Sequence, residues 1–235
     1  MTYKRVLLKL TGEMFGDDTR AGIDFDKVIK VATYIAHLRT EHKTDLAIVV
    51  GGGNLFRGRD LNLEKNKRAM ADYIGMMGTV MNGIALQIGL KMQGVESHVM
   101  SELLVKQACE PYYILKAVSH LDKGRVVILV GGRGSPFTTT DTAAAYKAAE
   151  LGCEILLKGS NVDGVYSADP KLDKNAEKFE TLSFQEAIEK GLMVMDLTAF
   201  TVCKEQKIPV IVFDISDLDN IERILNGEKV GTLIS

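Results

Sequence analysis

Short apolar runs that end in glycine or small polar residues recur along the chain. Five of them are rich in β-branched residues or leucine, at 6–10, 46–50, 126–130, 154–157 and 209–213. Runs this short and continuous are typical of strands buried on both faces of a parallel sheet. Stretches with helical spacing lie between them, at 24–41, 64–91, 142–151, 183–189 and 218–225. Strands that alternate with helices predict an α/β sandwich around a mostly parallel sheet.

The segment 64–91 carries an apolar stripe at steps of four and three, a spacing typical of one helix face. Its members are Met70, Ile74, Met77, Met81, Ile84 and Ile88. Glycines interrupt the helix at 75, 78, 83 and 89, and each costs about 1 kcal/mol relative to alanine. Close packing of another element is the expected compensation. The stripe favours a core helix, and a subunit interface on the methionine surface is the second interpretation.

Nothing in the chain reads as a linker, a repeat or a low-complexity stretch, so we expect one domain over 1–235. The segment 163–178 is dense in charge and contains Asp169-Pro170. Such a composition predicts a mobile surface loop there.

Composition narrows the class of protein. The 235 residues are 46% hydrophobic and 26% charged, as in globular proteins that bury a large core. Lys and Arg number 29 against 31 Asp and Glu, so there is no basic footprint for nucleic acid, and any phosphate site must be local. The three cysteines form no Cys-x-x-Cys pair, which argues against disulfides and zinc. With neither a signal-like start nor a membrane-length run, a cytoplasmic protein that does not engage membranes is expected.

Three glycine-rich junctions follow predicted strands. They are Leu10-Thr11-Gly12, Gly51-Gly52-Gly53-Asn54 and Gly131-Gly132-Arg133-Gly134-Ser135. Ligands of open α/β sheets bind at the carboxyl ends of the strands, and glycine lets the backbone approach a phosphate closely. The chain contains neither the Gly-x-x-x-x-Gly-Lys-Ser/Thr loop nor a Gly-x-Gly-x-x-Gly after a strand. The sequence therefore predicts phosphate binding by a different architecture.

Isolated cations accompany these junctions: Lys9 in the first strand, Arg57 after the second, and Lys158 at the end of the 154–157 run. A buried lysine needs an anionic partner, and phosphoryl transfer depends on positioned positive charge. Asp141 precedes a helical stretch, where an N-cap role is the local expectation. Its carboxylate could also orient the two lysines by charge-assisted hydrogen bonds. The four histidines show no metal-ligand spacing and are interpreted as structural or solvated.

Six strings then coincide with one family. They are KRVLLKLTGE at 4–13, GGGNLFRG at 51–58, MMGTVMNG at 76–83, PFTTTD at 136–141, NVDGVY at 161–166 and MDLTAF at 195–200. In their order and over nearly the whole chain they resemble the amino acid kinase superfamily, and within it the bacterial UMP kinases. The resemblance implies a three-layer αβα sandwich that transfers the γ-phosphoryl group of ATP to UMP with Mg²⁺.

The resemblance also implies roles for individual residues. Lys9 and Lys158 would stabilise the transition state and Asp141 would organise them, as the catalytic set. ATP would be held by Lys9, Leu10, Thr11, Gly12, Gly53, Arg57, Ser160, Asn161, Tyr166 and Asp169. UMP would be held by Gly52, Asp72, Arg133, Gly134, Ser135, Pro136, Phe137, Thr138, Thr139 and Thr140, with Asp72 on a ribose hydroxyl. No resident metal ligand is implied.

Family members are typically homohexamers with GTP activation and UTP inhibition, so this resemblance implies a hexamer and both effectors. Arg133 stands where the family usually has threonine, Glu154 where it often has aspartate, and the loop 13–22 is short. Two other functions stay open on the same fold. One is a kinase for a carboxylate or carbamate, which gives no reason for Arg57 and the 136–141 loop. The other is a non-catalytic nucleotide-binding or storage protein.

Overall fold

The computed structural model describes residues 3–16, 21–57, 63–168, 170, 172–173, 175–192 and 195–235. Its main strands are β1 (Arg5–Leu10), β2 (Asp45–Val50), β3 (Ser97–Ser101), β4 (Glu110–Pro111), β5 (Val126–Val130), β6 (Ile155–Ser160), β9 (Thr181–Leu182), β10 (Val210–Asp214) and β11 (Thr232–Ile234). They form one sheet in the order β4-β3-β5-β2-β1-β6-β10-β11-β9. Every pairing in it is parallel except that of β10 with β11. The predicted mostly parallel sheet is confirmed.

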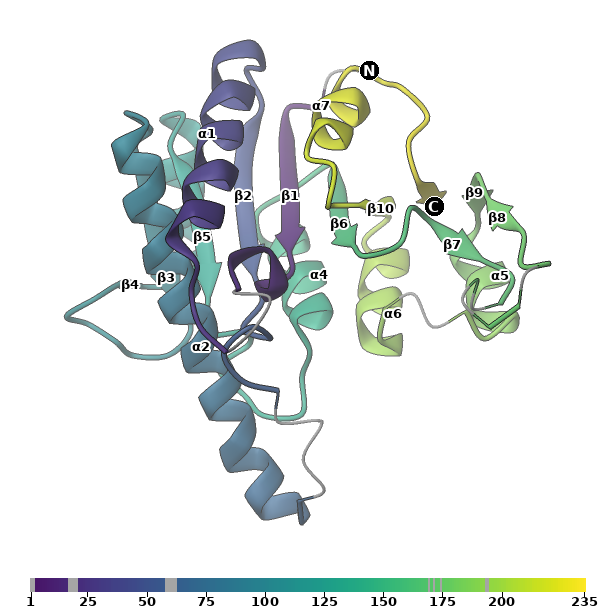
Figure 1. Cartoon of the computed structure of the whole chain (residues 1–235), viewed down its shortest axis with the longest axis horizontal. Coiled ribbons are helices and arrows are strands. Elements are labelled where there is room, and N and C mark those ends of the chain that lie inside the picture. The colour runs from purple at the N-terminus through teal and green to yellow at the C-terminus, as the bar shows by residue number, and fades with distance from the viewer. Residues whose placement is uncertain are drawn as a thin grey trace.

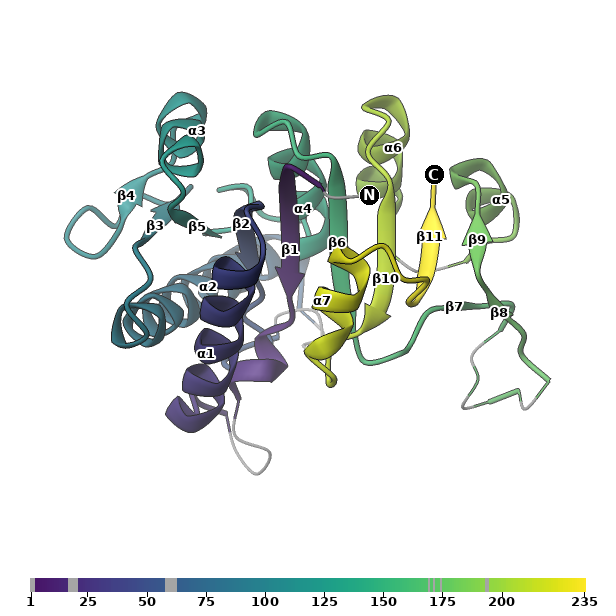
Figure 2. The ribbon, with the colours of Figure 1, turned by 90° about the horizontal axis from the view of Figure 1, so that it is seen from above.

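Helices cover both faces of this sheet. They are α1 (Phe25–Glu41), α2 (Lys65–Met92), α3 (Ile114–Asp122), α4 (Thr140–Glu150), α5 (Phe184–Glu189), α6 (Leu197–Glu205) and α7 (Asp219–Leu225). Figure 1 shows the strands edge to edge with α2 extending beyond them. In Figure 2, α1, α2 and α7 lie on one side of the sheet, and α3, α4, α5 and α6 lie on the other. The molecule is a three-layer αβα sandwich.

The alternation of side chains along each strand builds two apolar cores. In β1, Val6, Leu8 and Leu10 pack with α1, α2 and α7, whereas Leu7 packs with α3, α4 and α6. A continuous apolar run in the sequence therefore indicates a strand whose side chains pack into an apolar core on each face of the sheet. The same alternation directs Lys9 to the face that carries α4.

Apart from Ile84, which packs partly buried against the core, the apolar stripe of α2 faces away from the core. Met70 is 67% exposed and Met81 is 52% exposed, and Ile74, Met77 and Ile88 are exposed as well. The helix buries a different face, which is rich in small residues. The prediction of a core helix is therefore right for α2 but wrong for its stripe, because glycine and alanine let the other face lie closest to the sheet.

Close packing against neighbouring elements compensates for the helix stability that the glycines of α2 cost, as expected. A Cβ on Gly83 would lie 2.4 Å from Val130 Cγ1. A Cβ on Gly89 would lie 2.9 Å from the Cβ of Ala32 on α1. By length and composition α2 could also cross a membrane, but 56% of its apolar window is buried inside the fold, as in a core helix.

Two local predictions need correction. Thr139, not Asp141, caps α4, and its hydroxyl accepts hydrogen bonds from the backbone N–H groups of Asp141 and Thr142. Asp141 instead lies within the first turn. The predicted loop at 163–178 contains a small antiparallel pair, β7 (Val165–Tyr166) with β8 (Lys178–Phe179). Parts of that segment, at 169, 171 and 174, lie outside the described residues.

Candidate active site

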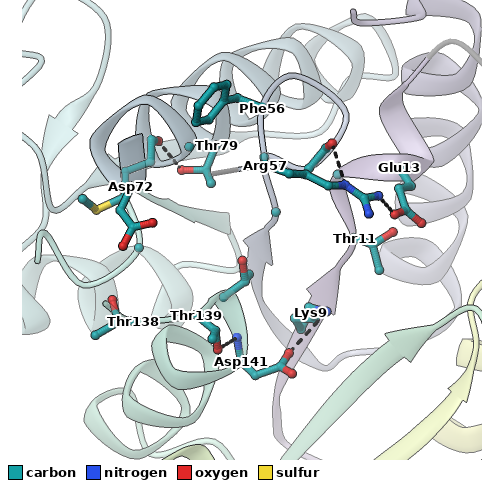
Figure 3. Close-up of a pocket in the computed structure, with 18 of the residues that line it drawn as sticks. Lys9, Thr11, Glu13, Phe56, Arg57, Asp72, Thr79, Thr138, Thr139 and Asp141 are labelled. Carbon is teal, nitrogen blue, oxygen red and sulfur yellow. Dashed lines mark hydrogen bonds and ion pairs between the residues drawn. The ribbon is translucent and has the colours of Figure 1, made fainter. Parts of the chain in front are cut away.

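A cleft of about 440 Å³ opens at the carboxyl ends of the central strands. Its walls come from the residues after β1, β2, β5 and β6, from one side of α2 and from the start of α4. Figure 3 shows Lys9 and Asp141 together at the bottom of the view, Asp72 at the left and Arg57 beside Glu13 at the upper right. A cavity of about 320 Å³ adjoins it and shares Thr11, Glu13 and Asn161 with it.

Two lysines and one carboxylate meet at the base of the cleft. The parallel register of β1 and β6 pairs Lys9 with Lys158 directly. Asp141, in the first turn of α4, reaches both: its Oδ1 is 3.3 Å from Lys9 Nζ and its Oδ2 is 2.5 Å from Lys158 Nζ. The expected contacts of Asp141 with both lysines are confirmed. A single carboxylate thus orients two ammonium groups.

The charge states follow from burial and from these pairs. Burial alone would raise the pKa of Asp141, but the positive charges of Lys9 and Lys158 outweigh it and hold that pKa below its ordinary value. Burial, and then the neighbouring Lys9, lower the pKa of Lys158, while Asp141 opposes that change. Asp141 is therefore ionised at neutral pH, and the cluster keeps one positive charge in excess when both lysines are protonated.

The first two glycine junctions lie against each other. A Cβ on Gly12 would be 2.7 Å from the backbone nitrogen of Gly53. A Cβ on Gly52 would be 2.5 Å from the carbonyl oxygen of Gly75 on α2. Glycine is needed here for close approach of backbone segments, because no side chain fits. Beside them the hydroxyl oxygen of Thr11 is buried, and it has no hydrogen-bond partner among the described residues.

Arg57 follows the second junction and lines the cleft. Its guanidinium forms an ion pair with Glu13, and its Nε donates to the carbonyl oxygen of Gly53 at 3.1 Å. Asn161 donates from its amide to the other oxygen of Glu13 at 2.6 Å. Glu13 therefore ties the segments after β1, β2 and β6 together at the cleft wall.

The third junction forms a tight loop after β5. Gly131, Gly132 and Gly134 all have positive φ, at 77°, 58° and 69°, a region that favours glycine. The N–H of Gly131 donates to the hydroxyl of Thr79 on α2 at 2.8 Å. These turns bring residues 132 and 135 to the cleft.

Asp72 links α2 to this loop. One oxygen accepts from Arg68 Nε at 2.8 Å, and the other accepts from the backbone N–H of Phe137 at 2.8 Å. Phe137 has a φ of 63°, which is uncommon for a residue with a side chain. The carboxylate of Asp72 therefore holds the distal end of the cleft in one conformation.

The Met-Asp-Leu-Thr-Ala-Phe string has a structural counterpart beside α4. Asp196 caps α6 by accepting from the N–H of Ala199, and its other oxygen accepts from the hydroxyls of Thr139 and Thr142. The start of α4, and Asp141 with it, is thereby fixed to α6.

Comparison with known proteins agrees with this geometry. The model of the amino acid kinase family matches residues 4–214. The chain belongs to the amino acid kinase family. A uridylate kinase of Corynebacterium efficiens is 48% identical over 233 residues, which cover 99% of this chain and 95% of that protein. A uridylate kinase of Corynebacterium jeikeium is 48% identical over 232 residues, covering 99% and 94%.

Solved structures resemble this family member over its whole length. The UMP kinase from Bacillus anthracis superposes with a TM-score of 0.94 at 35% identity, covering 100% of this chain and 97% of that one. The UMP kinase from Ureaplasma parvum gives a TM-score of 0.90 at 35% identity, covering both chains fully. The amino acid kinase fold that the resemblance implied is confirmed.

Most of the predicted site residues of this amino acid kinase line the cleft. They are Lys9, Thr11, Gly12, Gly52, Gly53, Arg57, Asp72, Ser135, Thr138, Thr139, Thr140, Asp141, Lys158, Ser160 and Asn161. Others have different surroundings: Arg133, Gly134, Pro136 and Phe137 are not among the lining residues, and the Leu10 side chain is fully buried in the core. Tyr166 donates to Asp163 in the small sheet, away from the lining residues. Asp169 lies outside the described residues.

The sequence analysis missed residues that the cleft includes. Arg68 precedes Asp72 by four positions, so the i, i+4 spacing on a helix was a usable signal. Thr79 contacts the third junction, and Glu13 pairs with Arg57. Both stand inside the motif strings but had no role assigned.

The histidines include a cluster that spacing did not predict. His98 Nδ1 lies 2.5 Å from one oxygen of Glu110, and His120 Nε2 lies 3.4 Å from the other. The two rings stack at 3.7 Å between centroids. Lys116 also pairs with Glu110, and Arg125 contacts His120 Nδ1 at 3.2 Å. The ligand atoms of His98, Glu110 and His120 all lie within 4.8 Å of one another, a grouping that the sequence interpretation of the histidines did not include.

Proposed function

We propose that the chain is a UMP kinase that transfers the γ-phosphoryl group of ATP to UMP, giving UDP and ADP. The observation that carries the transferase chemistry is the cluster of Lys9, Lys158 and Asp141 at the ends of two adjacent parallel strands. The identity of 48% to uridylate kinases over nearly the whole chain supports UMP as the acceptor.

Phosphoryl transfer needs the protein only to position the two substrates and to stabilise negative charge. A phosphate oxygen of UMP attacks the γ-phosphorus, and the bond from that phosphorus to the β,γ-bridging oxygen breaks. The attacking oxygen is already ionised at neutral pH, so no general base is needed. Lys9 and Lys158 stabilise the negative charge that spreads over the transferred group, and Asp141 keeps both ammonium groups aimed at it.

The donor side is assigned to the first two glycine junctions and to the residues after β6. Thr11, Gly12 and Gly53 offer backbone and hydroxyl groups to the ATP phosphates, and the unpartnered Thr11 hydroxyl fits such a role. Ser160 and Asn161 lie next to this region in the cleft.

The acceptor side is assigned to the other end of the cleft. Asp72 and the loop residues Ser135 and Thr138 to Thr140 line the same cleft. Arg57, which also lines it, is assigned to the phosphates of both substrates. A ribose hydroxyl can donate to Asp72, because a carboxylate accepts more hydrogen bonds than the two that Asp72 makes here.

Mg²⁺ is proposed to arrive with ATP. The carboxylates that line the cleft are each paired with cations: Glu13 with Arg57, Asp72 with Arg68, and Asp141 with the two lysines. Such a donor set fits an ion held mainly by phosphate oxygens and water, which is the usual arrangement for Mg²⁺ at nucleotides. The ion would neutralise phosphate charge during transfer.

The proposal includes an oligomer, in keeping with the exposed apolar stripe of α2. Met70, Ile74, Met77, Met81 and Ile88 form a row too apolar for a face that meets only water. We assign this face to a contact between copies of the chain, within a homohexamer. GTP and UTP as effectors, a cytoplasmic location and a single domain over 1–235 belong to the same proposal.

The experiment that tests it is a coupled ADP-release assay with Mg-ATP. UMP, CMP, dUMP, AMP, glutamate, aspartate and carbamate are offered in parallel. Turnover confined to UMP is the expected result. Turnover with a carboxylate or carbamate would reassign the acceptor within the family, and no turnover with any of the seven would support the storage or binding alternative.

A further inference from the structure

A buried ionic network lies behind the loop that follows β5, on the side away from the cleft. Its centre is Lys147 on α4, whose side chain is only 2% exposed. Its ammonium group pairs with Glu102 and lies 2.9 Å from Glu150 Oε2. The phenol ring of Tyr112 lies 3.3 Å from the same ammonium group, and its hydroxyl donates to Glu150 at 2.8 Å. A lysine buried this deeply is costly unless its partners are fixed.

Arg133 connects the loop itself to this network. Its Nη1 lies 3.2 Å from Glu150 Oε1, and its guanidinium stacks 3.7 Å from the ring centroid of Tyr146. The charges balance, since Lys147 and Arg133 face Glu102 and Glu150. Arg133 is not among the residues that line the cleft.

The loop rests directly on the segment that Lys147 holds. A Cβ on Gly131 would lie 3.1 Å from the backbone nitrogen of Glu102, and a Cβ on Gly134 would lie 3.4 Å from the Cβ of Glu102. Gly132 and Ser135, next to these positions, line the cleft. One turn therefore contacts the network through some residues and the cleft through others. A shift of Glu102 or Arg133 would move the surface that meets the acceptor.

We infer that Lys147, Glu150, Glu102 and Arg133 are positioning residues that fix the acceptor loop from behind, and that Arg133 acts through Glu150 instead of touching the acceptor nucleotide. The inference rests on the proposed function, because it takes UMP as the ligand of that loop. None of the four side chains is among the residues that line the cleft, so the network can act on the acceptor only through the loop.

Steady-state kinetics of the full-length enzyme test this, with UMP and ATP varied separately. Glu150→Gln removes the charge that Lys147 and Arg133 share, and Arg133→Ala removes the link to the loop. Each is expected to raise the KM for UMP about tenfold, the effect of losing one charge-assisted hydrogen bond. The KM for ATP and kcat should stay within about twofold. The double variant should be no worse than the more affected single variant, because both act through one contact.

Two further variants separate positioning from general damage. Lys147→Arg keeps the charge and should leave the KM for UMP near that of the wild type. Asp45→Asn breaks an ion pair of similar burial, with Arg5 at 3.1 Å, at the opposite end of β2, and should leave both KM values unchanged.

Each other outcome overturns the inference. If Arg133→Ala alone raised the KM for UMP and Glu150→Gln did not, Arg133 would be a direct ligand. Equal rises in both KM values, or a matching rise in Asp45→Asn, would indicate a merely structural role. If Glu150→Gln does not fold, Tyr112→Phe replaces it, because it removes only the hydrogen bond that the phenol donates to Glu150; a rise in the KM for UMP alone is again expected, and no rise would overturn the inference. Failure of the wild type to turn over UMP would instead refute the proposed function.

Discussion

Replacing Lys9 with methionine tests the centre of the proposed mechanism. Methionine keeps an unbranched stem of similar length in the strand and removes the ammonium group. Asp141 would still have Lys158 at 2.5 Å, so the buried carboxylate would not be left without a partner. The loss of stability should therefore be well below the roughly 3–5 kcal/mol that an unpaired buried charge costs.

The expected loss of activity is larger. Two unit charges about 4 Å apart interact by about 4 kcal/mol at an effective dielectric constant of about 20. The γ-phosphate is already charged in the ground state, so only the part of this attraction that grows in the transition state affects kcat. If about 3 kcal/mol of it does, kcat falls by at least about 10²-fold.

The assay is ADP release at saturating UMP and ATP, together with a thermal melting curve. Lys229→Met is the matched control, because Lys229 is highly exposed, its pair with Glu180 is long at 3.7 Å, and it is not among the residues that line the cleft. A Lys9→Met enzyme with wild-type kcat would refute the role of Lys9 in charge stabilisation. A large fall in melting temperature would show that the activity loss reflects folding instead.

Four other outcomes follow from named contacts. Asp72→Asn should raise the KM for UMP several-fold and leave that for ATP nearly intact, and equal losses would contradict the acceptor assignment. Met77→Asp should lower the mass measured by light scattering, whereas an unchanged mass with a normal melting curve would count against the α2 contact. The pKa of Asp141 is depressed below its ordinary value of 3.8, so its contribution to stability is present above that pH and is lost as pH falls through the folded-state pKa. In acid titrations, the difference in unfolding free energy between the wild type and Asp141→Asn should therefore shrink below about pH 4. Burial raises the pKa of Cys153 and Cys203 to about 12, so a thiol reagent at pH 8 should label them only after unfolding.

The central strands could be predicted because burial on both faces leaves a continuous apolar run. β5 was predicted with its observed bounds, and β1 and β2 to within one residue at the start. β3 was missed because its sequence, Ser97 to Ser101, includes polar residues that its place near the sheet edge tolerates. α6 was missed because Thr198 and Thr201 interrupt its apolar spacing, while Asp196, its cap, was a usable signal.

The sequence indicated that distant segments would meet at the site, but it did not show which residues would contact each other. The sequence shows one lysine in a predicted strand and another directly after a second one. Only the register of β1 with β6 sets Lys9 beside Lys158. The network around Lys147 gave no signal, because a lysine within an alanine-rich helix usually faces water. Its burial depends on Glu102, which comes from the segment after β3. Pairings of this kind depend on the order and register of the strands in the folded sheet.

The hydrophobic pattern also could not predict which face of α2 is buried. Both faces of the helix are apolar, one through methionine and isoleucine and the other through small residues. Periodicity favours the face with the larger side chains, but the sheet and α1 select the face that comes closest. The steric demand at Gly83 and Gly89 decides this choice, since each would place a Cβ within 3 Å of a neighbouring side chain.

The charges of the cleft explain why a protein with a net charge of −2 can bind two nucleotides. Four cations line it, Lys9, Arg57, Arg68 and Lys158, against three carboxylates. Arg57 and Arg68 are each matched one to one, so the surplus positive charge lies at the lysine pair around Asp141. That surplus is at the proposed point of transfer, and it is small beside the charge of ATP and UMP together. The remaining negative charge must be neutralised by a cation that enters with the substrates, which is the physical reason to expect dependence on Mg²⁺.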